Sequence, residues 1–114
     1  MATSKDFLDY LKEQLSGLDD VTFRPMMGEY LIYYRGRLVG DICDDRLLIK
    51  PVPTAVKLMP DAEMQPPYKG AKEMLVADVD NGGFLKELFN AIYEELPPPK
   101  QKKKKRNIKK AARS

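Results

Sequence analysis

Three neighbouring carboxylates are the first candidates for chemistry in this sequence. Asp41, Asp44 and Asp45 lie close together along the chain, and hard cations such as Ca²⁺ bind carboxylate oxygens. Such an ion needs about six oxygen ligands from several directions, and Asp44 and Asp45 also suit an ordinary tight turn. A small enzyme or metal-binding protein that uses this region is therefore kept as an alternative interpretation.

The second candidate is Cys43, the only cysteine in a chain without histidine. A reactive thiolate usually needs a neighbouring base, and structural zinc sites need several Cys or His ligands. A small buried strand residue is the simpler interpretation of Cys43. The sequence also lacks the GxxxxGK and GxGxxG phosphate loops. We therefore predict that the protein is not an enzyme and has no catalytic residues, cofactor, bound metal or small-molecule substrate.

The third candidate is a run of nine basic residues with no acidic residue among them: Lys100, Lys102, Lys103, Lys104, Lys105, Arg106, Lys109, Lys110 and Arg113. Clustered cations neutralise phosphates and release counterions, so this run predicts non-specific, salt-dependent binding to nucleic acid. It contains no aromatic side chain on which a base could stack. Two alternatives stay open, because the run could instead aid solubility or lie against the rest of the chain.

Charge divides the chain into two parts. Of 20 basic and 17 acidic residues, nine basic and no acidic ones follow Pro99, so residues 1–99 have a net charge of −6. The basic part has a single large apolar residue, Ile108, and cannot offset the entropy of ordering by burial. We therefore predict a folded domain over residues 1–97 and a disordered Pro/Lys-rich tail over residues 98–114.

The sequence shows no feature of a membrane or secreted protein. No apolar run approaches the roughly 20 residues that span a bilayer, and the first six residues do not begin a signal peptide. We expect a cytoplasmic protein that does not contact membranes.

The elements that must position these residues follow from local patterns. Apolar spacing predicts helices over residues 4–16 and 84–96, and a shorter one between prolines at 54–59. Branched and aromatic runs predict five strands over residues 21–24, 29–34, 37–43, 46–50 and 73–78. Tight turns at Arg35–Gly36 and Asp44–Asp45 join the middle three strands into an antiparallel meander, and Gly28 suits an unusual backbone bend. Pro25 is expected to end the first strand, and residues 61–70 to form a loop. The fold class is therefore α+β, a two-layer sandwich in which the N- and C-terminal helices cover one face of an antiparallel sheet.

The middle strands are apolar on both sides, for example at Leu31 and Tyr33 as well as Ile32. A half-solvated sheet would alternate more cleanly, so the second face is a candidate for a protein partner or for a homodimer. Equally, the short helix and the loop at 61–70 could fold over that face.

Three segments together carry a family resemblance. The segment RPMMGEYLIY (residues 24–33), the segment DDRLLIK (44–50) and the segment PPYKGAK (66–72) resemble, in this order, motifs of the TfoX N-terminal domain of bacterial competence regulators. The residues that carry the resemblance are Arg24, Met26, Gly28, Tyr30, Asp44, Asp45, Arg46, Lys50, Tyr68 and Gly70.

The resemblance implies an α/β two-layer fold without established catalytic residues, and a role in transcription regulation. Combined with the charge pattern, it predicts a transcription co-regulator that contacts protein through its folded domain and nucleic acid through its tail. A purely structural, dimerising module is a further alternative.

Overall fold

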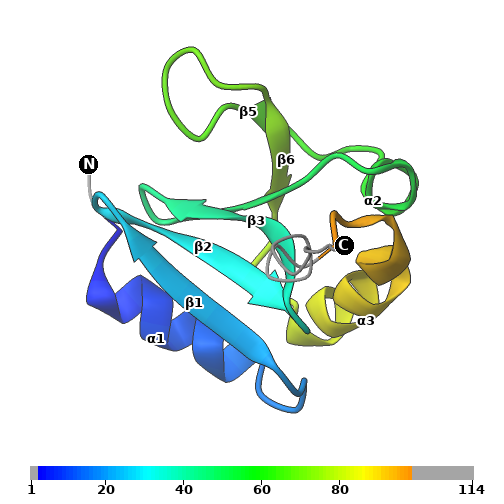
Figure 1. The fold of residues 1–114 in the computed structure, drawn as a ribbon, viewed down its shortest axis with the longest axis horizontal. Coiled ribbons are helices and arrows are strands. Elements are labelled where there is room, and N and C mark those ends of the chain that lie inside the picture. Colours follow the sequence, from blue (N-terminus) through cyan, green and yellow to red (C-terminus); the bar gives the residue numbers. More distant parts are fainter. Residues whose placement is uncertain (1–2, 99–114) are drawn as a thin grey trace, which may run out of the picture.

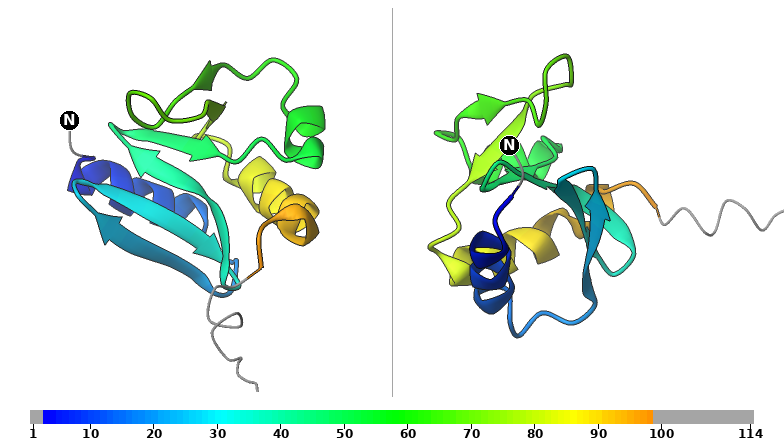
Figure 2. Two further views of the ribbon diagram at one scale, coloured as in Figure 1. Left: turned by 45° about the horizontal axis from the view of Figure 1, so that its top comes forward. Right: turned by 90° about the vertical axis from the view of Figure 1, so that its left-hand side faces the viewer.

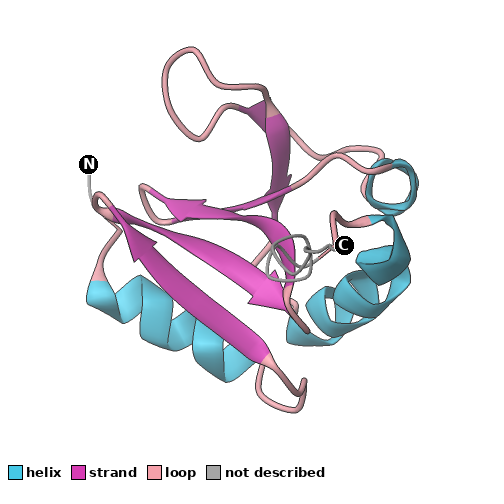
Figure 3. Ribbon diagram, viewed as in Figure 1, coloured by secondary structure: helices cyan, strands magenta, loops and turns pink. Residues whose placement is uncertain are grey.

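The computed structural model describes residues 3–98 and shows an antiparallel six-stranded sheet with helices on one face (Figure 1, Figure 3). The strands are β1 (Val21–Met26), β2 (Glu29–Tyr34), β3 (Arg37–Cys43), β4 (Arg46–Ile49), β5 (Met64–Gln65) and β6 (Met74–Ala77). The helices are α1 (Lys5–Gln14), α2 (Pro53–Leu58) and α3 (Gly82–Ile92), which continues as the 3₁₀ turn η1 (Tyr93–Glu95). The predicted α+β class is confirmed, with β5 as an additional short strand inside the expected loop. The basic residues from Lys100 onward lie outside the described residues, as does nearly all of the predicted tail.

Spatial order in the sheet is β1-β2-β3-β4-β6-β5, so the first four strands form a meander. Each link of the meander is a two-residue turn, and both central residues have positive φ in all three turns, at Met27–Gly28, Arg35–Gly36 and Asp44–Asp45. This is the backbone of type I′ hairpins, whose twist matches that of the strands. The turn predicted at Arg35–Gly36, the turn predicted at Asp44–Asp45 and the special bend at Gly28 are confirmed.

Helix α1 forms where the sequence predicts it. The Ser4 hydroxyl caps it by accepting a hydrogen bond from the backbone N–H of Phe7 at 3.1 Å. Leu8, Leu11 and Leu15 recur on one side and are buried against the sheet. α1 and α3 lie on the same face of the sheet, as two views of the ribbon show (Figure 2).

The single main core lies between that sheet face and the helices. It includes Ile32 and Ile49 from the sheet, together with Phe89 and Leu88 from α3. α2 packs into the same core through Ala55, and its N-terminus is fixed by the Glu95 carboxylate, which accepts hydrogen bonds from the backbone N–H and hydroxyl of Thr54.

A bulge changes the faces that simple alternation predicts for β3. The register shifts between Ile32 and Tyr33, so that Ile32 pairs with Gly40 while Tyr33 pairs with Leu38. Val39 is the extra residue, and it joins the same core cluster as Ile42. Strict alternation along β3 predicts Val39 on the face opposite Ile42, together with Cys43, and the bulge makes that prediction wrong.

Pro25 does not end β1, contrary to expectation; the strand continues to Met26 and Pro25 pairs in register with Tyr30. The proline is tolerated because β1 is an edge strand. The Asp20–Arg35 backbone hydrogen bond sets the alternation of the ladder, which turns the nitrogen of Pro25 away from β2.

Candidate functional site

The second face of the sheet has a mixed character. Cross-strand partners lie on one face, and the register places Arg24, Leu31, Asp41, Leu48 and Val76 in one row across five strands. Arg24 is at the end of this row on the edge strand β1, and Asp41 is at its centre. Leu48 is fully buried, and Asp41 is only 9% exposed.

Part of this face is covered by the chain itself. The loop between β5 and β6 approaches the end of β3, where the Cys43 thiol donates a hydrogen bond to the carbonyl oxygen of Pro67 at 3.2 Å. Cys43, Leu48 and Met74 form a small second core there. The expectation that the 61–70 loop folds over the face is met at this end, whereas α2 packs into the main core on the other side.

The three motif segments meet at one end of the sheet. The Met27–Gly28 turn, the Asp44–Asp45 turn and the loop at Pro67–Tyr68 come from distant parts of the sequence. Together they line an open cavity of about 410 Å³, with Glu29, Cys43 and Arg46 contributed by β2, β3 and β4. We call this cavity the turn pocket.

The chain start supports the turn pocket from outside. The backbone N–H of Ser4 donates to the Asp45 carboxylate at 2.8 Å, and the backbone N–H of Thr3 donates to the Gly28 carbonyl at 3.1 Å. These two contacts tie both hairpin turns to the N-terminal end of α1.

Arg46 and Cys43 form a polar network inside the turn pocket. The Arg46 guanidinium donates to the carbonyl oxygen of Cys43 at 3.4 Å, to its sulfur at 3.5 Å and to the side-chain oxygen of Gln65. Burial raises the pKa of the Cys43 thiol, and the nearby Arg46 charge opposes this shift without cancelling it. The thiol is thus held neutral, which agrees with the predicted role as a buried strand residue.

Two carboxylates on the second face make no side-chain hydrogen bond or ion pair with any of residues 3–98. Glu29 lines the turn pocket, and its Oε1 atom is buried without a hydrogen bond to any of residues 3–98. Burial raises the pKa of Glu29, and the charge of Asp41 raises it further. Burial likewise raises the pKa of Asp41, which Lys50 partly opposes. Placing two such carboxylates near one another is costly unless a donor satisfies them.

The rim of the turn pocket is apolar and exposed. Met27 is 97% exposed at φ 49°, and Tyr68 is 57% exposed. Residue type alone predicts that Met26 and Met27 fill the core, and for Met27 this prediction is wrong. Met26, at the end of β1, is also partly exposed. The signal that could have identified Met27 is a large apolar residue before glycine in a hairpin turn, where Asn, Asp or Gly is usual. Glu29 and Gln65 carried no comparable signal.

The aspartates singled out from sequence are divided by the fold. Asp41 is buried on the second face, whereas Asp44 and Asp45 are exposed on the β3–β4 turn. Within the described part of the chain, no three Asp, Glu, Cys or His side chains lie close enough together to hold a metal ion.

The remaining motif residues frame the turn pocket without lining it. Arg24 and Met26 lie on the edge strand, and Tyr30 packs against the main core from β2. Lys50 follows β4 and lies near Asp41, and Gly70 has φ 90° in the loop after Tyr68. The nine basic residues from Lys100 onward are outside the described residues.

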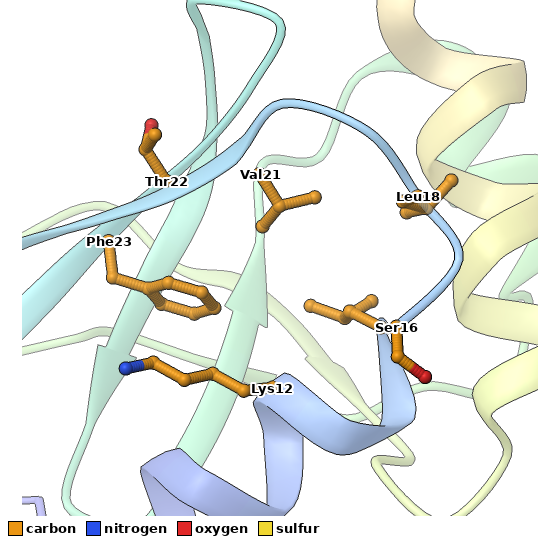
Figure 4. Close-up of a pocket in the computed structure, with 7 residues that line it drawn as sticks. Lys12, Ser16, Leu18, Val21, Thr22 and Phe23 are labelled. Atoms are coloured by element: carbon orange, nitrogen blue, oxygen red, sulfur yellow. The ribbon is translucent and has the colours of Figure 1, made fainter.

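A second open cavity, of about 510 Å³, lies between the C-terminal end of α1 and β1 (Figure 4). Lys12 lies 5.4 Å from the centre of the Phe23 ring, and Val21 and Leu18 form the apolar wall (Figure 4). No motif residue lines this cavity, and the turn pocket therefore remains the candidate site.

The comparisons with known proteins agree with the motif positions. The family described as the TfoX N-terminal domain matches residues 13–95. An uncharacterized 12.7 kDa protein in the trpE 5′ region of Spirochaeta aurantia is 33% identical over 99 residues, which cover 85% of this chain and 86% of that protein. No solved structure matches. None of the helices formed by residues 3–98 is long and apolar enough to cross a membrane.

Proposed function

The chain belongs to the TfoX N-terminal domain family, and from this premise we propose that it is a binding module with a competence-regulator-like role in transcription. It works without catalysis: the folded domain contacts a protein at the second sheet face, and the basic residues after Pro99 hold nucleic acid non-specifically.

The convergence of the three motif segments carries the protein-binding part of this proposal. Segments some 20 residues apart in sequence line one pocket, and the rim presents Met27 and Tyr68 to solvent. Exposed large side chains around a partly buried polar centre are typical of protein contact sites, where aromatic and methionine residues are enriched. The turn pocket is the part of the second sheet face at which we place the contact.

Charge segregation supports the nucleic-acid part. Nine cations within residues 100–114 oppose a net charge of −6 on the preceding residues. A polyanion would therefore be attracted by the C-terminal segment and repelled by the domain, so the affinity should reside in one short stretch.

A salt titration tests the nucleic-acid part. The full chain, a chain ending at Pro99, and a full chain with Lys102, Lys103, Lys104 and Lys105 all changed to Gln are titrated with a DNA duplex and with RNA. We expect the full chain to bind with a slope of about −0.9 in log K per log salt for each phosphate neutralised, and both variants to lose most of that affinity. Equal binding by all three proteins would move the interaction to the folded domain, and no binding by the full chain would refute this part.

The protein-binding part needs a separate readout. A second copy is the first partner to examine, by light scattering of the full chain at increasing concentration and of the Met27→Asp variant. A monomer at all concentrations would exclude the homodimer and leave a different protein as the partner.

A further inference from the structure

We propose that the turn pocket binds the basic segment of its own chain, residues 100–110, and that a lysine side chain of that segment occupies the pocket. Docking of this kind deepens the proposed function, because a segment held by the domain is withheld from nucleic acid. The docking itself does not depend on nucleic-acid binding.

The floor of the turn pocket requires a donor. Oε1 of Glu29 is buried without a partner among the described residues, and the neighbouring Asp41 side chain is nine-tenths buried with no ion pair to any of residues 3–98. A primary ammonium group offers three hydrogen-bond donors and a full positive charge, which is what a buried, unpartnered carboxylate lacks.

The walls fit the rest of a lysine side chain. Lysine has an apolar four-carbon stem behind its charged end and buries the stem along apolar surface where it can. The turn pocket has apolar rim groups in Met27, Pro67 and Tyr68 above its acidic floor. Tyr68 can also face a cation with its ring, which adds a cation–π attraction of about 0.5–1 kcal/mol at an exposed site.

Charge around the turn pocket favours a cation despite Arg46. Glu29 and Asp44 line it together with Arg46, so the lining has two carboxylates and one guanidinium, and nearby Asp41 is balanced by Lys50. Arg46 is already engaged by Gln65 and Cys43 through hydrogen bonds. A phosphate or a carboxylate ligand would meet this excess of negative charge, whereas a lysine is attracted by it.

The segment is long enough to reach. The end of the 3₁₀ turn η1 is held at the end of the meander opposite the turn pocket, where Arg37 donates to the carbonyl oxygen of Leu96 at 3.2 Å. From there to Glu29 is the length of β2, roughly 20 Å for a six-residue strand. An extended chain covers about 3.3 Å per residue, so residues near Lys105 can reach the turn pocket from Pro98.

Zero-length cross-linking of the full chain tests the docking directly. A carbodiimide joins a lysine ammonium to a carboxylate that it touches, and mass spectrometry identifies the pair. We expect cross-links from Lys102–Lys110 to Glu29 or Asp44, and loss of the Glu29 cross-links alone in Glu29→Gln. A 1:1 mixture of ¹⁴N- and ¹⁵N-labelled protein at low concentration should give cross-links within one label only.

The matched control is Glu87→Gln. Glu87 is exposed on α3, away from the turn pocket, and the variant makes the same change in net charge. In low-salt titrations with a DNA duplex we expect Glu29→Gln to bind about three- to tenfold more tightly than the native chain, because the docked population is released. Glu87→Gln should differ from the native chain by less than about twofold, as expected for one remote charge.

The two readouts separate this proposal from the proposed function. Cross-links spread evenly over all exposed carboxylates, or mixed-label cross-links, would overturn docking within one chain. Equal DNA affinities for the two variants, in a chain that does bind DNA, would overturn it as well. If the native chain binds no nucleic acid, the proposed function fails in that part, and the Glu29 cross-links still decide the docking.

Discussion

The thiol of Cys43 lies 3.2 Å from the carbonyl oxygen of Pro67, to which it donates a hydrogen bond. This contact joins β3 to the loop that carries Tyr68. The only cysteine of the chain therefore links the sheet to one wall of the turn pocket. The burial that comes with this role raises the pKa of the thiol.

The first prediction concerns this thiol. Because burial raises the pKa of Cys43 above its ordinary value of about 8.5, alkylation by iodoacetamide at pH 7.5 should be at least about tenfold slower in the native chain than in urea. The raised pKa favours the folded state below the ordinary thiol pKa, and that advantage is lost as the pH rises through the folded pKa. The free energy of unfolding should therefore fall above about pH 8.5, and less so in Cys43→Ala. Rapid alkylation of the folded chain at pH 7.5 would contradict the assignment.

The second prediction concerns Gly40, next to the bulge in β3. A Cβ atom at this position would lie 1.9 Å from the carbonyl oxygen of Leu48 in the neighbouring strand. Gly40→Ala should therefore lower the free energy of unfolding by about 3 kcal/mol or more, measured by urea denaturation. Gly83→Ala is the control, since its nearest neighbour would be Asn81 Oδ1 at 3.8 Å. That variant should be neutral or up to about 1 kcal/mol more stable, because alanine favours the helix.

The third prediction separates stability from binding at Met27. Its φ of 49° is strained for a methionine, and its side chain contributes no burial to the domain. Met27→Asn should keep the hairpin and raise the free energy of unfolding by up to about 1 kcal/mol, since asparagine tolerates this conformation. The same change should reduce the cross-links between the basic segment and Glu29. A loss of stability would show that Met27 supports the fold itself.

The fourth prediction concerns Arg37, whose side chain holds the 3₁₀ turn η1 against the start of β3. Its Nη1 donates to the carbonyl oxygens of Tyr93, Glu94 and Leu96, and its guanidinium lies 4.5 Å from the Tyr93 ring centre. Arg37→Lys keeps the charge but loses the planar group that bridges these oxygens, so we expect a loss of about 1–2 kcal/mol. Hydrogen exchange should then quicken at η1 before it does in β3; uniform protection would contradict a local role.

Sequence patterns were informative wherever a local signal decided the structure. The Leu8–Leu11–Leu15 spacing predicted α1, and turn residues such as Gly36 predicted the meander, because helices and hairpins follow from short-range preferences. β5 was missed because two residues flanked by prolines and a loop have no periodicity to detect.

The candidate site was predictable only in part. Motif residues such as Asp44 and Tyr68 could be named from the sequence, but their meeting at the turn pocket depends on the strand order, which no local pattern specifies. The bulge at Val39 had no signal either, and it decides which side chains of β3 share a face with Cys43. The importance of Glu29 follows from an unsatisfied oxygen, which is a property of the packed structure alone.

Pro25 at the outer edge of the sheet limits how this domain can associate. With no N–H to offer at the penultimate residue of β1, this edge is a poor template for another strand, and continuous growth of the sheet from copy to copy is discouraged there. A high local concentration, such as crowding of many copies along one polyanion, should therefore not seed fibres from this edge. At this edge, a partner must instead recognise the domain through its side chains.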